Sequence, residues 1–149
     1  MGDISLHFSR HEFDCRDGTQ VPPDMMPDLT RFVHGVLEPI RAAVLSMFPV
    51  KPDNFRCDVW SGYRTVTHNR KEKGADDSMH LKARAADIVF LCYDTGDTKL
   101  WSLVRLLWRE GHLTNLGGLG RYDNRIHVDD RPHEPGVLAE WDFRTGHRR

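Results

Sequence analysis

The chain has 149 residues, of which 39% are hydrophobic and 29% are charged, and its formal net charge is −1. This length predicts one domain over residues 1–149, with a core that buries roughly 70% of the surface of the unfolded chain. The charge leaves no basic footprint of the kind that nucleic-acid-binding proteins carry, so we expect no nucleic-acid partner.

The three cysteines, Cys15, Cys57 and Cys92, are widely spaced and form no CxxC pair. This pattern predicts free thiols in a reducing compartment rather than disulfides or a zinc knuckle. The sequence shows no basic start followed by an apolar stretch and no apolar run long enough to span a bilayer. We therefore expect a monomer that is made in the cytoplasm without a signal peptide and does not bind a membrane.

In chain order, the first 24 residues are expected to be mostly loop, and the first periodic segment runs from Asp28 to Phe48. Its apolar residues recur at helical spacing, with Asp28 as a candidate N-cap, and Pro39 predicts a kink or a split. A strand is expected within FRCDVWSGY, residues 55–63. A short helix is expected within TVTHNRKEKGA, ending near Gly74.

The second half of the chain predicts a strand at 85–92, a turn at YDTGD and a helix at 98–110 that stops at Gly111. The segment NLGGLGRYDN is rich in glycine, RIHVDD is a short strand, and the tail from Pro135 is expected to form one or two turns around Trp141. Together these elements predict an α+β fold with helices packed on a small, mainly antiparallel sheet.

One carboxylate lies in an unusual place for a core strand. Asp87 sits in the apolar run AADIVF, where a carboxylate needs a cation, a donor network or a metal as a partner. His80 precedes it in a loop, and strand alternation in RIHVDD places His127 and Asp129 on one face. His80, Asp87 and His127 would give zinc two nitrogens and one oxygen with one position open, as in catalytic zinc sites. Taken singly, Asp87 is more often a strand-end carboxylate and His80 a solvated loop residue.

Four blocks, SGYRT, HN, SMHLKARAADI and GLGRYDNRIHVDDR, carry a family resemblance in this order. The chain resembles the zinc D-alanyl-D-alanine peptidases of bacterial cell-wall metabolism, whose fold is compared with that of the hedgehog signalling domain. The similarity begins near HFSRHEFDC and continues to about Arg131.

The resemblance implies a zinc ion held at His80, Asp87 and His127. It further implies that Arg64 faces a substrate carboxylate or the developing oxyanion, and that Ser78 lies along the substrate cleft. The chain departs from the family pattern twice, with Ala83 at a usual glycine and Asn124 where many relatives have an acidic general base.

The sequence thus predicts a zinc metallopeptidase that hydrolyses D-amino-acid-containing bonds in the peptide part of peptidoglycan, as a carboxypeptidase or an endopeptidase. By analogy, the expected setting is a phage or prophage endolysin, or a virion protein, that acts at the cell wall. Two alternatives stay open: a non-catalytic zinc-binding interaction module and a dipeptidase for free D-Ala-D-Ala.

The general base is a separate question, for which the sequence favours Asp129 over Asp123. Asp129 shares a strand face with His127, whereas Asp123 lies in a probable turn, where aspartates commonly bond their own backbone. Asp129 has two other possible roles, which are orienting a ligand histidine and pairing with Arg131.

Overall fold

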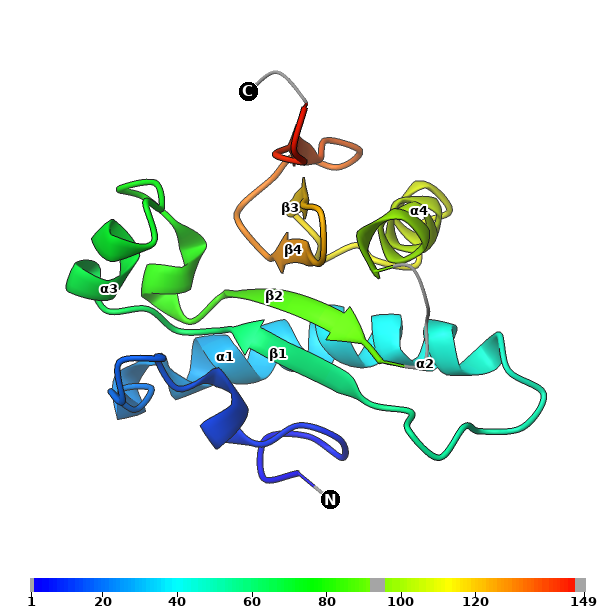
Figure 1. Cartoon of the computed structure of the whole chain (residues 1–149), viewed down its shortest axis with the longest axis horizontal. Helices are drawn as coiled ribbons and strands as arrows, with labels where there is room; N and C mark the ends of the chain where they lie inside the picture. Colours follow the sequence, from blue (N-terminus) through cyan, green and yellow to red (C-terminus); the bar gives the residue numbers. More distant parts are fainter. Residues whose placement is uncertain (1, 92–95, 147–149) are drawn as a thin grey trace.

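The computed structural model describes residues 2–91 and 96–146 of the chain. Its centre is a five-stranded sheet with the order β1-β2-β4-β3-β5. All neighbouring strands are antiparallel except β3 and β5, which are parallel. The predicted α+β fold with a mainly antiparallel sheet is therefore confirmed (Figure 1). The strands are β1 (Cys57–Ser61), β2 (Ala85–Phe90), β3 (Gly118–Arg121), β4 (Ile126–Asp129) and β5 (Ala139–Asp142).

The long periodic segment forms α1 (Met26–Phe32), a π-helical turn (Val33–Leu37) and α2 (Glu38–Ser46). Pro39 lies in the first turn of α2 and has no backbone N–H to donate to the preceding turn. The predicted break is therefore present as the wider π-helical turn that precedes α2. The predicted N-cap is wrong. The helix begins at Met26, after a short 3₁₀ turn, so that Asp28 lies in its first turn.

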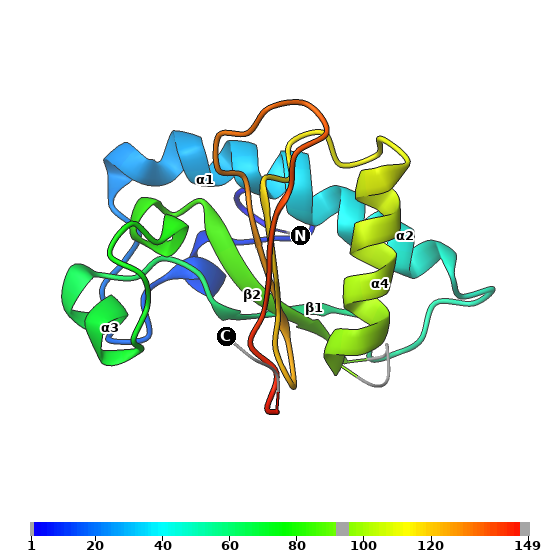
Figure 2. The same ribbon diagram turned by 90° about the horizontal axis from the view of Figure 1, so that it is seen from above.

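The remaining helical segments are short turns and helices, except for the longer helix α4. They are the 3₁₀ turns Arg10–Phe13 and Met79–Lys82, helix α3 (Val66–Lys71) and helix α4 (Gly96–Arg109). Seen from above, α1 and α2 run along the molecule and α4 runs across their direction (Figure 2). In the described ranges, no helix is both long and apolar enough to cross a membrane.

Two of the three cysteines can be placed. Cys15 and Cys57 are buried and free, as the sequence predicts, and burial raises the pKa of the Cys57 thiol well above its ordinary value. Cys92 and most of the turn expected at YDTGD lie outside the described residues.

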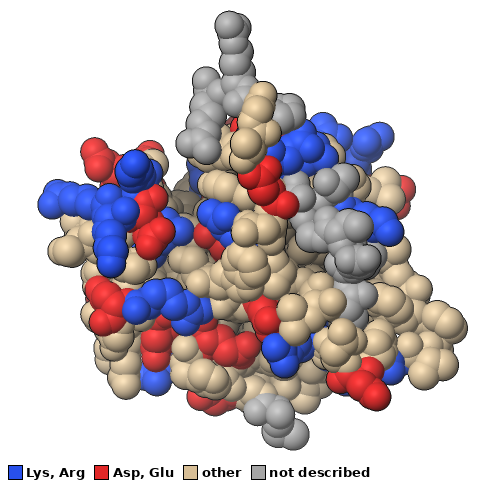
Figure 3. All heavy atoms as spheres, viewed as in Figure 1, with Lys and Arg blue, Asp and Glu red and all other residues tan. Residues whose placement is uncertain are grey.

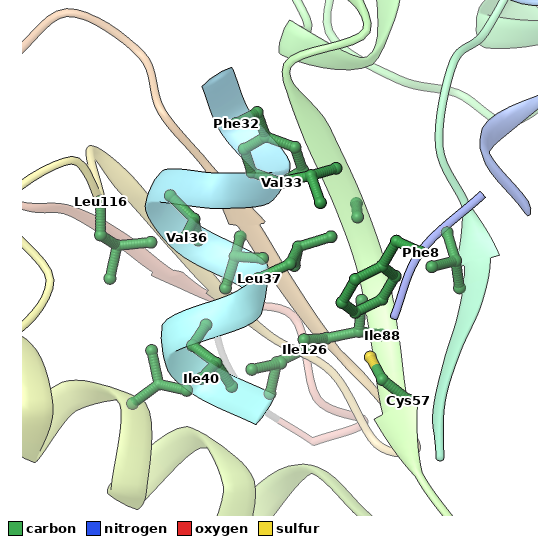
Figure 4. Close-up of a cluster of buried hydrophobic side chains, with 14 of the residues drawn as sticks. Phe8, Phe32, Val33, Val36, Leu37, Ile40, Cys57, Ile88, Leu116 and Ile126 are labelled. Carbon is green, nitrogen blue, oxygen red and sulfur yellow. The ribbon is translucent and has the colours of Figure 1, made fainter. Parts of the chain in front are cut away.

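The core lies between the sheet and the helices. Phe32, Val36 and Ile40 of the α1–α2 segment belong to one cluster with Ile88 of β2 and Ile126 of β4, and all five are fully buried (Figure 4). Leu100 and Val104 of α4 join the same cluster. Each such side chain stabilises the fold by roughly 1.5–3 kcal/mol relative to exposure. Because strand side chains alternate, the neighbours of Ile88 and Ile126 point to the opposite face of the sheet.

Strands β3 and β5 were not predicted. The glycine-rich segment forms β3, and the expected turns around Trp141 are instead β5. A Cβ atom at Gly118 would overlap the carboxylate of Asp129, and one at Gly120 would overlap the indole of Trp141. The glycines therefore make room for these two side chains.

This close approach gives a stability prediction. Gly120→Ala should lower the free energy of unfolding by about 1–3 kcal/mol, because the new methyl group has no space beside Trp141. Urea denaturation would measure the loss. In a Trp141→Ala background the same change should cost nothing, because the obstructing ring is gone. An equal loss in both backgrounds would contradict the assignment.

Candidate metal centre

A single row of residues crosses the sheet on the face opposite the core. Asp87 of β2 is paired with His127 of β4, His127 with Gly120 of β3, and Gly120 with Trp141 of β5. The His127 and Trp141 ring centroids lie 5.0 Å apart across the glycine. Register alone therefore brings two predicted ligands together.

His80 reaches the same point from the turn Met79–Lys82. The Ser78 hydroxyl accepts a hydrogen bond from the backbone N–H of His80 at 3.2 Å and starts the turn. Ala83 ends it in the left-handed conformation, with φ of 56°. Glycine adopts this conformation without steric cost, which explains why glycine suits position 83.

The three predicted ligands form a tight triangle. The distances are 3.4 Å from His80 Nε2 to Asp87 Oδ1, 3.2 Å from His127 Nδ1 to Asp87 Oδ1, and 3.2 Å between the two nitrogens. His80, Asp87 and His127 are all nearly fully buried. Zinc bound tetrahedrally at about 2.0–2.1 Å would separate its ligand atoms by ~3.3 Å. The triangle therefore has the size of one face of a zinc tetrahedron.

Hydrogen bonds on the outer side of each ring fix where the protons lie. His80 Nδ1 is 2.6 Å from the carbonyl oxygen of Gly62, and His127 Nε2 is 2.7 Å from Asp129 Oδ2. Both partners only accept, so these nitrogens donate, and His80 Nε2 and His127 Nδ1 direct lone pairs inward. With the Asp87 oxygen, three electron-rich atoms face one another, an arrangement that a bound cation stabilises.

The electrostatics of the triangle fit the same description. Burial lowers the pKa of His80, which favours the neutral ring that binds metal. Burial acts against ionisation of Asp87, but the two histidines outweigh it and hold the pKa of Asp87 well below its ordinary value. Burial likewise acts against a charged His127, yet the hydrogen bond to Asp129 and the negative charge of Asp87 raise the pKa of that ring, so a metal ion competes with a proton there. Asp87 is thus ionised and ready to coordinate.

Asp129 lies behind His127 and not in the cleft. Its carboxylate is completely buried and accepts hydrogen bonds from Arg131 Nε at 2.9 Å and Arg131 Nη2 at 2.6 Å, in addition to the one from His127. Burial would raise the pKa of Asp129, but Arg131 and His127 outweigh it and keep the pKa below its ordinary value. This geometry favours the orienting role that the sequence left open over the role of general base.

Arg64 lies on the other side of the triangle. Its guanidinium contacts Ser61 Oγ at 3.0 Å, Asn69 Oδ1 at 3.3 Å and Asp87 Oδ2 at 3.3 Å. Asn69 is itself buried and donates to the carbonyl of Ala75 at 2.9 Å. Arg64 is therefore fixed in position, and it donates a hydrogen bond to Asp87 Oδ2, the oxygen that does not contact the histidines.

The triangle opens into a cleft of about 730 Å³. Its lining comes from two parts of the chain, residues 72–80 and residues 122–125 with 141–145, and Figure 1 shows the first part to the left of the second, both above β2. Arg64, Ser78 and Asp123 line it, together with all three predicted ligands.

Sequence reasoning missed two residues of this cleft, Arg125 and Trp141. Arg125 Nε lies 3.5 Å from Asp87 Oδ2. The signal for Arg125 was present, because alternation from His127 places residue 125 on the same face. Trp141 had no local signal, because its place depends on the pairing of β5 with β3.

A second group, Cys15, Asp17 and His68, also has potential ligand atoms within 4.8 Å of one another. The carboxylate of Asp17, however, already accepts hydrogen bonds from the Thr19 backbone N–H at 2.9 Å and the Thr65 hydroxyl at 2.8 Å. We therefore assign the metal to the His80–Asp87–His127 triangle, whose three inward atoms face one another.

Comparison with known proteins agrees with this centre. The model of a family described as Peptidase M15 matches residues 28–129, which include the triangle, Arg64 and Asp129. No curated protein and no solved structure matches the chain.

The ligand assignment predicts one zinc ion per chain. His80→Ala, Asp87→Ala and His127→Ala should each abolish zinc retention after dialysis, measured by elemental mass spectrometry. Circular dichroism should show a folded domain in each case, since the core does not rest on the metal. His68→Ala is the matched control and should keep its zinc. Full occupancy in all three triangle variants would show that the ligand set is wrong.

The orienting role of Asp129 gives a second prediction. Asp129→Asn should weaken zinc affinity by roughly 10–100-fold, because the amide no longer fixes the proton on His127 Nε2 as a carboxylate does. Competition with a chelator dye would measure the affinity. Asp123→Asn should leave it unchanged. Unaltered affinity in Asp129→Asn would argue against the orienting role.

Proposed function

The chain belongs to the peptidase M15 family of zinc metallopeptidases, and we propose that it hydrolyses D-amino-acid-containing bonds in the peptide part of bacterial peptidoglycan. The observation that carries this proposal is the triangle of inward lone pairs at 3.2–3.4 Å, open to a cleft large enough for a peptide. The proposed setting, by analogy with small phage enzymes, is a lysis or virion protein that acts at the cell wall.

His80, Asp87 and His127 would hold the zinc ion in this reaction. Zinc in such a site polarises a carbonyl group and lowers the pKa of water toward about 7. The chain's own part is to keep the three ligands in place before substrate arrives. The Gly62 carbonyl, Asp129 and Arg64 do so from the outer side of each ligand.

We assign Arg64 to stabilising negative charge that develops on the substrate carbonyl oxygen. Its guanidinium lines the cleft and is fixed by Ser61 and Asn69, so it requires no rearrangement when that charge forms. Ser78, which caps the turn that carries His80, lines the cleft beside it and is assigned to substrate contact.

For the general base we propose Asp123 in place of Asp129. Of these two carboxylates, only that of Asp123 lines the cleft. The hydroxyl and backbone N–H of Thr145 both donate to it, and these bonds lower the pKa of Asp123, which keeps it ionised at neutral pH. A base must be ionised and must face the cleft in which the substrate would bind, and Asp123 meets both requirements.

The decisive experiment for the function is a product analysis. Zinc-loaded protein should release peptide fragments or D-amino acids from purified peptidoglycan, identified by mass spectrometry. A chelator should stop the release, and added zinc should restore it. Asp87→Ala is the negative control. Zinc binding without release would favour an interaction module, and release from free D-Ala-D-Ala alone would favour a dipeptidase.

The roles of Arg64 and Asp123 can be separated from metal binding. Arg64→Lys keeps the charge but loses the planar fork that spans three partners, so turnover should fall while zinc content stays unchanged. Asp123→Asn cannot accept a proton and should lower turnover by roughly 10²–10⁴-fold with zinc retained. Full activity of Asp123→Asn would return the base to Asp129 or to another carboxylate of the cleft.

A further inference from the structure

Two arginines contact the same oxygen of Asp87 but differ in how they are held. Arg64 is 12% exposed, and each of its three guanidinium nitrogens contacts a protein oxygen. Arg125 is 29% exposed and lies farther from that oxygen, at 3.5 Å against 3.3 Å. Arg64 is thus held by the protein at all three guanidinium nitrogens, whereas Arg125 lines the same cleft and is more exposed.

Arg125 is nevertheless fixed in direction. Its guanidinium stacks over the ring of Tyr122 at 4.2 Å, and Nη1 donates to the Asn124 side chain at 3.1 Å. A guanidinium held by an aromatic face and one hydrogen bond keeps its planar fork ready for a carboxylate. The β3–β4 hairpin thus presents a cation beside a metal ligand.

The local charge favours an anionic group at this point. Three guanidinium groups, those of Arg64, Arg125 and Arg131, contact two carboxylates, those of Asp87 and Asp129. Arg64 and Arg125 thus share the one carboxylate of Asp87, although the lining of the whole cleft has as many acidic as basic residues. On the face seen in Figure 3, positive and negative side chains are interspersed. Selectivity for an anion must therefore come from the two arginines beside Asp87.

We propose that Arg125 is a specificity residue that binds a free α-carboxylate on the residue immediately after the scissile bond. This inference rests on the proposed function. Arg125 contacts a ligand of the metal, so a group that it binds must lie only a few atoms from the substrate carbonyl. An α-carboxylate meets this condition, because three bonds separate it from the scissile carbonyl carbon.

Two kinds of peptide carry such a carboxylate. One is a peptide that ends at the leaving residue, which makes the reaction a carboxypeptidase step. The other is a peptide whose leaving residue continues through its side chain, which leaves its α-carboxylate free. An ordinary α-linked peptide bond has an uncharged amide at this place and would leave the cation of Arg125 without a partner.

The test compares a substrate that has this carboxylate with one that lacks it. The probes are N-acetyl-D-alanyl-D-alanine and its C-terminal amide. Zinc-loaded protein should prefer the acid in kcat/KM by roughly 10–100-fold, the range expected for a hydrogen-bonded charge pair. In Arg125→Gln the ratio of acid to amide should fall to about one, with zinc content unchanged. Arg56→Gln, at an exposed site on the far end of β1, should keep the ratio.

A binding measurement separates the two proposals. NMR titration of the zinc-free protein gives the dissociation constants of both probes without turnover. A preference for the acid that disappears in Arg125→Gln supports the assignment, even if the protein hydrolyses neither probe and the proposed function fails. An unchanged preference in Arg125→Gln, or one that disappears only in Arg64→Gln, would overturn it.

Discussion

Three electron-rich atoms held 3.2–3.4 Å apart in a buried place are the constraint on which the site depends. Each alone is an ordinary buried polar group, but together they repel one another unless a cation lies between them. The surrounding structure supports this arrangement from outside. The Gly62 carbonyl, Asp129 and Arg64 each contact the outer side of one ligand, so that no ligand can turn away without losing a hydrogen bond.

The sheet makes this arrangement possible through a residue with no side chain. Gly120 lies between His127 and Trp141 in one row of paired residues, and Gly118 lies beside Asp129. The room left by these two glycines is filled by the indole and by the carboxylate that hold His127 from behind. Strand β3 has few side chains of its own at these positions, so its neighbours can pack closely, and this packing positions the candidate metal ligand His127.

The parts of the site that the sequence could predict are those set by local rules. Strand alternation and a carboxylate in an apolar run were sufficient to predict Asp87 and His127 as candidate ligands. Their chemistry then indicated His80 as the third candidate. The same rules placed Asp129 on the face of His127, but alternation cannot show that its carboxylate bonds the outer nitrogen of that ring. The sequence did not predict the position of Trp141 or the strand β3, because both depend on pairing between distant segments, which no local pattern encodes. Pro39 was recognised as a disruption, although its accommodation by a π turn was not foreseen.

The distance along the chain between the ligands has a consequence for biosynthesis. His80 and His127 are 47 residues apart, and β4 must pair with β2 before they meet. An emerging polypeptide cannot assemble the triangle until β4 has left the ribosome and paired. Closing so long a loop is among the slower steps of folding. The candidate metal site therefore forms only after β4 has paired with β2, late in the synthesis of the chain.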